Sequence, residues 1–422
     1  MPIFPRTSGL SRVTHVVARR TVHAALAWLH GNPQTVLKWQ SEFCAIPAPP
    51  FGESARAEWL TDRFHEIGLS EVSTDAIGNV LGFINPQDHH PESSGPLVVL
   101  SAHLDTVFPA ETELNPVLTV VDGHDRLECP GASDNAAGVA GMLAIAKALV
   151  ASGAELPCPL LLVGNVGEEG EGDLRGMRHL YGARSLAERI ASHIVLDGAG
   201  NDSAVTQALG SRRFLVTISG PGGHSFTDSG TPNPIAAMAT ALARLAATAV
   251  PDEPRTTLNL GTIHGGTSVN SIPESVMASI DFRSTSTEEL TRLEVALHRA
   301  VEDAVDQWNG AAVNPARQRG SLVYTIKKIG DRPAAQLPES SPMLETLRSV
   351  DRHLGITTGV RLGSTDANIP LALGVPAVSL GAGGEGGGAH TLAEWYYTKD
   401  REIGLRRILL LTLTMMDWAA EL

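Results

Sequence analysis

The chain has 422 residues, more than the ~250–300 at which one hydrophobic core usually splits, so we expect two domains. Hydrophobic residues make up 43% of the sequence and charged residues 18%, which is ordinary for a soluble globular protein. The net charge of −14, without a basic cluster, excludes a typical nucleic-acid-binding protein. Only three cysteines are present, which fits a reduced, cytoplasmic compartment.

The sequence gives no signal for association with a membrane. Its longest apolar runs fall well short of the ~20 residues that a membrane-spanning helix requires. The first ten residues lack the apolar core of a signal peptide. We therefore expect neither a membrane nor nucleic acid among the partners.

The first half of the chain alternates predicted helices and strands. Gly68 stands where a C-terminal helix cap belongs. Segments between the strands are long enough for parallel crossovers, so we expect an α/β fold with a mixed sheet flanked by helices. The expected helices span 10–31, 33–44, 53–67 and 136–151. The expected strands span 79–84, 96–100, 160–166 and 194–196.

The character of the sequence changes near residue 207. The next ~120 residues alternate strand, helix, strand, strand, helix, strand, which is the ferredoxin-like α+β pattern. An α/β pattern resumes afterwards, so we interpret this part as an insertion. Its expected strands are 212–219, 256–263, 275–283 and 321–328, and its expected helices are 233–249 and 287–308. The expected domains are 1–207 together with 331–422, and the inserted 208–330.

Polar side chains with metal-binding chemistry follow the predicted strand 96–100. His103 and Asp105 are two residues apart, so on extended chain they project to the same side. The carboxyl edge of the strands is where open α/β sheets place their ligand sites. A lone His-x-Asp pair is more often a buried histidine beside a solvated carboxylate, so its interpretation depends on the rest of the chain.

Further carboxylates and one histidine occur at comparable points. Asp134 stands at or near the start of the long Ala/Gly-rich helix, where an aspartate often serves only as the N-cap. Glu168 and Glu169 follow the next strand between glycines, and adjacent buried glutamates are unfavourable unless they are solvated, paired or metal-bound. Asp197 ends the following strand, and His390 follows a glycine-rich loop.

Taken together, these side chains suit two divalent metal ions. Zn²⁺ accepts imidazole and carboxylate ligands, and one shared carboxylate can hold two ions ~3.5–4 Å apart. Asp134 is the natural bridge, and Asp105 would receive the second ring N–H of His103. Glu168 would take the proton from the attacking water and pass it to the leaving amine. The expected metal ligands are His103, Asp134, Glu169, Asp197 and His390.

Five motifs, spread over about residues 35–420, resemble those of a known family. It is the family of co-catalytic di-zinc metallopeptidases that includes carboxypeptidase G, aminoacylase, acetylornithine deacetylase, succinyl-diaminopimelate desuccinylase and tripeptide aminopeptidase (peptidase T). The motifs in this chain are S-A-H-L-D-T-V, G-A-S-D-N-A-A-G, G-E-E-G-E-G-D, L-D-G and A-H-T-L-A-E.

This resemblance implies a zinc-exopeptidase-like fold and a role for each residue of the site. Asp105 and Glu168 match the catalytic pair of the family. The ligands that the resemblance implies are His103 and Asp197 for one zinc ion, Glu169 and His390 for the other, and Asp134 as the bridge between them.

The resemblance also implies that the inserted domain is a lid through which two chains dimerise. His224, in G-P-G-G-H-S, matches the lid histidine that stabilises the oxyanion in the partner's site. Asn270 and Arg283 lie in segments that match those gripping substrate, where they would hold a free carboxylate. From the residues alone, His224 is a turn histidine and Arg283 a surface arginine.

We therefore expect a homodimeric hydrolase of amide bonds that uses two divalent ions, Zn²⁺ or alternatively Co²⁺ or Mn²⁺. An exopeptidase on short peptides is the favoured activity. A deacylase of N-acyl amino acids shares the metals and the base and differs only in the substrate pocket. The non-enzymatic alternative is an inactive metal-binding dimerisation protein, and the intact Glu168 argues against it.

Overall fold

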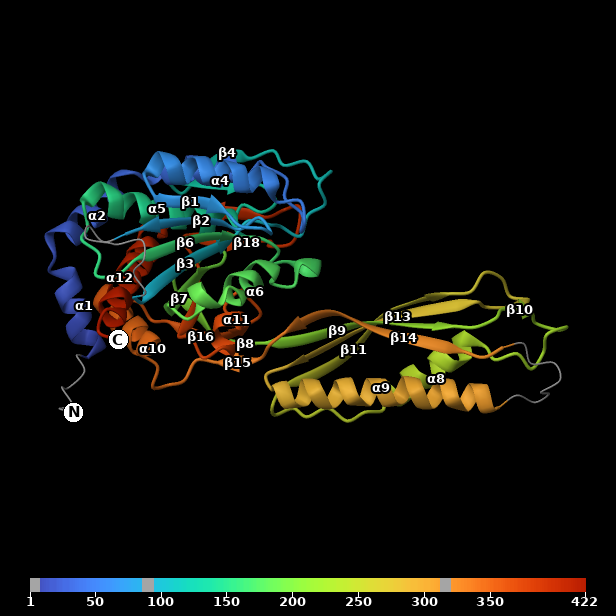
Figure 1. Ribbon diagram of the computed structural model, residues 1–422. Helices are drawn as coiled ribbons and strands as arrows, with labels where there is room; N and C mark the ends of the chain where they lie inside the picture. The colour runs from blue at the N-terminus through green and yellow to red at the C-terminus, as the bar shows by residue number, and fades with distance from the viewer. Residues whose placement is uncertain (1–7, 86–94, 312–319) are drawn as a thin grey trace, which may run out of the picture. The chain divides into compact units, whose positions relative to one another are not determined.

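The computed structural model describes residues 8–85, 95–311 and 320–422, which form two compact units (Figure 1). Unit 1 comprises the chain up to Ala208 and again from Gln336 to Leu422, and unit 2 is Leu209–Ala335. The middle of the chain is therefore an insertion between two parts of unit 1. Residues 1–7, which include most of the segment considered above as a leader, lie outside the described residues.

The N-terminal helices of unit 1 differ in one respect from the prediction. The helix expected over 10–31 is two helices, because the backbone becomes extended at Arg19. Tertiary packing explains the break: the first helix contacts α10 (Pro342–Leu354) and α12 (Arg401–Ala419), whereas the second packs mainly on α5 (Ala136–Ser152). Gly68 has a φ of 96° and ends α4 as expected. The bounds are α1 Gly9–Val17, α2 Arg20–Gly31, α3 Pro33–Cys44 and α4 Ser54–Ile67.

The expected mixed sheet is confirmed, with the strand order β1-β2-β6-β3-β7-β17-β8-β15 and β16 paired to β8. Strands β6, β3, β7 and β17 are parallel neighbours, so their carboxyl ends meet at one edge of the sheet. Their bounds are β1 Ser70–Thr74, β2 Val80–Ile84, β3 Leu97–His103, β6 Leu160–Asn165, β7 Ile190–Leu196, β8 Ser203–Ala208, β15 Ala335–Gln336, β16 Gly359–Gly363 and β17 Ala377–Leu380.

Helices cover both faces of this sheet, and Figure 1 shows α5 and α6 on opposite sides of β3 and β6. Helices α5 and α12 pack on β3 and β7, while α6 and α11 border a core cluster that includes Leu97 and Val163. No helix among the described residues is long and apolar enough to cross a bilayer. The helices are α5 Ala136–Ser152, α6 Arg175–Gly182, α7 Arg184–Ala187, α10 Pro342–Leu354, α11 Asn368–Ala372 and α12 Arg401–Ala419.

A second, four-stranded sheet in unit 1 was not predicted from the sequence. Its strand order is β18-β19-β5-β4, all antiparallel. Strand β5 leads into the Asp134 loop, and β18 and β19 flank His390, so this sheet ties two distant parts of the sequence together. The strands are β4 Val117–Val121, β5 His124–Glu128, β18 Glu385–Gly387 and β19 Trp395–Tyr397.

Unit 2 has the expected strand-helix-strand-strand-helix-strand order, with an antiparallel sheet β11-β13-β9-β14. Helices α8 and α9 lie side by side on one face of this sheet and bury its core (Figure 1). A short pair of strands, β10 and β12, extends from it. The bounds are β9 Gly210–Ser219, β10 Gly223–His224, α8 Pro234–Ala246, β11 Thr256–Gly265, β12 Ser271–Ile272, β13 Ser275–Ser284, α9 Thr287–Gly310 and β14 Val323–Arg332.

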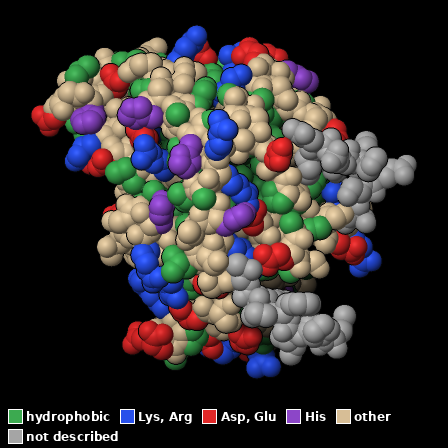
Figure 2. All heavy atoms as spheres, turned by 90° about the vertical axis from the view of Figure 1, so that its left-hand side faces the viewer, with side chains coloured by type: hydrophobic (Ala, Val, Ile, Leu, Met, Phe, Trp, Pro, Cys, Tyr) green, Lys and Arg blue, Asp and Glu red, His purple; other side chains and the backbone are tan. Residues whose placement is uncertain are grey.

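The charged side chains on the surface are mixed in sign. Figure 2 shows one face of the molecule, on which Lys and Arg side chains are interspersed with Asp, Glu and His side chains. The net charge of −14 is therefore the excess of 46 Asp and Glu residues over 32 Lys and Arg residues in the chain.

Candidate metal centre

His103 is the last residue of β3 and is held rigidly at the carboxyl edge of the main sheet. Its side chain is buried, and the strand is paired on both sides, with His103 opposite Asn165. The ring Nδ1 lies 3.1 Å from the carbonyl oxygen of Asp105 and 3.6 Å from its carboxylate Oδ1. The carbonyl, rather than the expected carboxylate, is thus the nearer acceptor. A proton held on Nδ1 leaves Nε2 as the ligand atom.

The Asp134 carboxylate lies between two histidines. Its Oδ1 is 3.1 Å from Nε2 of His103, and its Oδ2 is 3.1 Å from Nε2 of His390. The alternative that Asp134 merely caps helix α5 is wrong, because Asn135 is the N-cap and its side chain accepts the N–H of Gly138. Both oxygens of Asp134 are therefore directed to the imidazoles.

The remaining two carboxylates complete a set around each imidazole. Glu169 Oε1 lies 3.0 Å from Nε2 of His390, and Asp197 Oδ1 lies 3.8 Å from Nε2 of His103. The ligand atoms of His103, Asp134 and Glu169 lie within 4.8 Å of one another, as a metal site requires. The structure thus brings all five expected ligand residues together at one edge of the sheet.

The electrostatics of the centre are those of carboxylates gathered around imidazoles. Burial disfavours the charged form of His103, but three neighbouring carboxylates outweigh it and raise its pKa well above the ordinary value. The hydrogen bond to Asp134 raises the pKa of His390 to about 9. Burial, reinforced by the charge of Asp134, raises the pKa of Glu169 to about 7. Without a cation, the centre therefore retains protons at neutral pH.

Asp105 fixes the turn that carries the two adjacent glutamates. Its carboxylate accepts the backbone N–H of Glu168 at 3.0 Å and that of Glu169 at 2.8 Å. Glycine is required at position 172 of this turn, since a Cβ there would lie 2.5 Å from the Cα of Gly167. Glu168 is itself buried beside the site. The predicted residues Asp105 and Glu168 are therefore part of the same arrangement as the ligands.

Glu394 supports the centre and had been given no role from the sequence. Its buried carboxylate accepts three backbone N–H groups, from Gly131, Ser133 and Asp134, each at 2.8 Å. It therefore anchors the loop that presents Asp134. The only sequence signal was its place in the motif A-H-T-L-A-E, four residues after His390.

Asp366 is a second buried carboxyl group to which no role was assigned from the sequence. Its Oδ2 accepts the Nδ2–H of Asn165 at 2.7 Å, and burial raises its pKa to about 7. Asn165 is the cross-strand neighbour of His103, so Asp366 lies behind the strand ends that carry the site. A position after a short loop gives no signal of this burial.

The three expected residues of unit 2 lie at two different places in that unit. His224 pairs with Ser271 across β10 and β12, and the N–H of Ser225 donates to the carbonyl of Asn270 at 3.0 Å, so His224 and Asn270 are neighbours. Arg283 lies near the far end of β13 and pairs with Asp281. At ~3.4 Å per residue, β13 separates the two places by about 27 Å.

The α/β fold and the cluster at its sheet edge define a metal-dependent hydrolase. The chain belongs to peptidase family M20/M25/M40, whose model matches residues 99–413. A protein of Neosartorya fischeri described as a probable carboxypeptidase is 27% identical over 309 residues, covering 67% of this chain and 69% of that protein. The chain is therefore a metal-dependent hydrolase of this family, as the motifs indicated.

Solved structures share the fold over nearly the whole chain. A tripeptidase from Staphylococcus aureus has a TM-score of 0.71 at 22% identity, covering 93% of this chain and 99% of that one. Aminopeptidase PepT from Bacillus cereus has a TM-score of 0.70 at 19% identity, covering 92% and 99%. The YXEP protein of Bacillus subtilis, described as a dinuclear metal-binding peptidase, has a TM-score of 0.61 at 16% identity, covering 91% and 98%.

Proposed function

We propose that the chain is a di-zinc exopeptidase that acts on short peptides. The observation that carries the proposal is the position of Asp134, whose two oxygens each lie 3.1 Å from a different imidazole. A carboxylate so placed suits a bridge between two ions, with His103 and Asp197 as ligands of one and His390 and Glu169 of the other. Imidazole nitrogen and carboxylate oxygen are a donor set that Zn²⁺ accepts, as do Co²⁺ and Mn²⁺.

In this proposal the chain supplies the proton transfers and the positioning. Divalent ions at the site would polarise the amide carbonyl and lower the pKa of water. Glu168, next to the ligand Glu169 and buried beside the site, takes the proton of the attacking water and delivers it to the leaving nitrogen. Asp105 accepts the backbone N–H of Glu168, and Glu394 accepts that of Asp134. The loops that carry the proposed base and the proposed bridging carboxylate are therefore preorganised before substrate binds.

We further propose that the active enzyme is a cytoplasmic homodimer formed through unit 2. Strand β11 is an edge strand whose side chains are exposed from Asn259 to Gly265, and such an edge is a template for pairing with a second chain. The separation of Asn270 from Arg283 within one unit 2 also supports a dimer, because one copy of that unit cannot place both on one carboxylate. The buried thiols Cys44, Cys129 and Cys158 suit a reducing compartment.

Loss of the His224 side chain should lower kcat ~10²–10³-fold while both metal ions stay bound, because a donor to the developing oxyanion is removed. Measurement of kcat and of metal content in His224→Ala checks this. His298→Ala, which removes an exposed histidine from α9 of the same unit, is the matched control and should leave kcat unchanged.

Mixing experiments decide whether His224 acts across the dimer. His224→Ala has intact metal ligands and Glu168→Ala has an intact lid histidine, so an exchanged heterodimer contains one complete site only if His224 acts in trans. Recovery of activity after demonstrated subunit exchange is the expected result. An unchanged, low activity after exchange would refute the shared site.

The substrate class is tested by a turnover screen of the metal-loaded protein. Dipeptides and tripeptides should be hydrolysed faster than N-acyl amino acids, and the opposite order would favour the deacylase. If Arg283 holds a free carboxylate, Arg283→Ala should raise KM for free-acid peptides and hardly change the low activity on amidated ones. An equal effect on both kinds of substrate would contradict that role.

Metal binding should release protons, and the apparent affinity should fall as the pH falls. His390, with a pKa of about 9, and Glu169, at about 7, carry protons in the metal-free centre that a ligand must lose. Each proton released lowers the apparent affinity about tenfold per pH unit. Calorimetric titration near pH 7 in buffers of different protonation enthalpy counts the protons, and His390→Ala should release fewer. A pH-independent affinity would contradict the ligand assignment.

A further inference from the structure

A cavity of ≈ 560 Å³ lies in unit 1 among elements that do not contribute to the metal centre. It is bordered by the junction of α2 and α3, the β4–β5 turn and the start of α12. Its volume is within the range of ~300–1,000 Å³ that small-molecule sites occupy. The buried side chains of Leu29, Val36 and Leu405 provide an apolar wall, and the other lining residues are largely polar or charged.

Arg401 is a buried cation at this cavity, with an exposed fraction of only 5%. Its Nε donates to the hydroxyl of Tyr396 at 2.8 Å and its Nη2 donates to Gln40 Oε1. Both partners are neutral, and within the described residues Arg401 forms no ion pair and its Nη1 has no hydrogen-bond partner. The guanidinium carbon of Arg401 also lies 4.5 Å from the centre of the Tyr396 ring, a cation–π contact that offsets part of the cost of burying the charge. The unused donor and the lack of a counter-ion still favour an anion beside the guanidinium.

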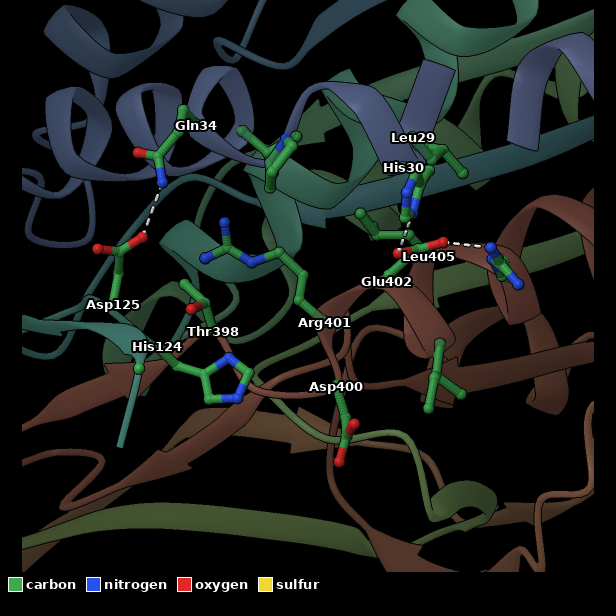
Figure 3. Close-up of a pocket in the computed structure, with 15 residues that line it drawn as sticks. Leu29, His30, Gln34, His124, Asp125, Thr398, Asp400, Arg401, Glu402 and Leu405 are labelled. Atoms are coloured by element: carbon green, nitrogen blue, oxygen red, sulfur yellow. Dashed lines mark hydrogen bonds and ion pairs between the residues drawn. The ribbon is translucent and has the colours of Figure 1, made fainter. Parts of the chain in front are cut away.

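The carboxylates at the cavity differ in how far their charges are already compensated. Glu402 pairs with Arg406 and with Nδ1 of His30 at 2.9 Å. Asp125, in contrast, accepts only the neutral amide of Gln34, at 2.8 Å, and forms no ion pair with any described residue. Figure 3 shows the Arg401 side chain among the lining residues, with Asp125 on one side and Glu402 on the other.

The cavity therefore presents a cation without an ion pair, Arg401, an apolar wall, and two carboxylates that form no ion pair with a described residue, Asp125 and the exposed Asp400. We propose that it binds a small zwitterion of the α-amino acid class. The ligand's carboxylate would lie on Arg401, its ammonium group on Asp125, and its apolar side chain against Leu29, Val36 and Leu405. Arg401 is oriented in advance by Tyr396 and Gln40, so a planar carboxylate meets a guanidinium that is already fixed.

The contacts of Arg401 also connect the cavity to the metal centre. Gln40, which is fully buried, accepts from Arg401 and donates its amide to the carbonyl of Ala132 at 2.6 Å. Ala132 lies two residues before Asp134, in the loop that Glu394 anchors. A ligand on Arg401 therefore acts on the position of Asp134. Since free amino acids are products of peptide hydrolysis, this regulatory role, unlike the binding itself, rests on the proposed function.

Calorimetric titration of the metal-loaded, full-length protein tests the binding. The probes share one hydrocarbon skeleton: L-leucine, 4-methylpentanoate without the ammonium group, and 3-methylbutylamine without the carboxylate; inorganic phosphate tests for a bare anion site. Arg401→Gln should weaken L-leucine binding at least about tenfold, the equivalent of one charge-assisted hydrogen bond. Asp125 is partly exposed, so Asp125→Asn should not endanger the fold. This variant should bind L-leucine more weakly than the wild type does and should bind 4-methylpentanoate with unchanged affinity. Lys399→Gln, which removes an exposed neighbouring charge outside the cavity, is the matched control.

The outcomes separate the cavity from the metal centre. If L-leucine also binds at the metal centre, that part of the calorimetric signal should be retained in both Arg401→Gln and Asp125→Asn. If the whole L-leucine signal is retained in Arg401→Gln and Asp125→Asn, the proposed site is refuted, and preferential binding of phosphate would refute the zwitterion. For regulation, L-leucine should change kcat/KM for a peptide by an amount that is lost in Asp125→Asn and kept in Lys399→Gln. Binding without that difference would refute the regulatory role and leave the binding site standing.

Discussion

Chelation should abolish amide hydrolysis completely, and added Zn²⁺ or Co²⁺ should restore it. The five convergent ligand residues have no other evident function, and the proton transfers assigned to Glu168 have no activated water to act on without the ions. Unit 1 should stay folded, because His103 and His390, when protonated, hold Asp134 and Glu169 through the 3.0–3.1 Å contacts seen in the structure. Activity, elemental analysis and circular dichroism of the same sample check the three parts of this prediction.

The control for metal removal is a variant that lacks one ligand. Asp197→Ala should bind less metal than the wild type and should need more added metal to approach full occupancy. A fully active sample that contains no metal by elemental analysis would refute the di-metal proposal. Loss of the native circular dichroism on chelation would instead show that the ions are needed for folding as well as for hydrolysis.

The edge of the main sheet was predictable because it depends on local sequence. Short apolar runs followed by His, Asp or Glu identify strand ends, and parallel strands bring those ends together. His103, Glu169 and Asp197 illustrate this, since each follows or ends a run that was recognised as a strand. For Asp134, the sequence could not distinguish a helix cap from a ligand, and the structure excludes the cap, because Asn135 takes that role.

What the sequence could not predict depends on contacts between distant parts of the chain. Glu394 holds the N–H of Asp134, 260 residues away, and Gln40 reaches Ala132 from helix α3. No hydrophobic periodicity or motif spacing in the sequence indicates which distant residues such side chains contact. The separation of Asn270 from Arg283 is different, because the extended strand that was expected over 275–283 already places the two residues far apart.

Glu168→Gln and Glu169→Gln should have different effects although the two residues are adjacent. Loss of the base in Glu168→Gln should lower kcat ~10²–10⁴-fold or more, with both ions bound and KM little changed. Loss of a ligand in Glu169→Gln should weaken the binding of one metal ion, so activity should partly recover at high metal concentration. The structure supports a ligand role for Glu169, because its Oε1 lies 3.0 Å from Nε2 of His390. The backbone does not distinguish the two residues, since Asp105 accepts the N–H of both.

Metal content and kcat, measured as functions of added Zn²⁺, separate the two roles. Glu171→Gln, an exposed glutamate in the same turn, is the matched control and should behave as the wild type. Near-ultraviolet circular dichroism should be unchanged in all three variants, since the backbone hydrogen bonds that hold the turn remain. Equal loss of metal from Glu168→Gln and Glu169→Gln would show that both residues are ligands and that the base must be sought elsewhere. Recovery of Glu168→Gln at high metal concentration would lead to the same conclusion, because added metal cannot replace a missing proton acceptor.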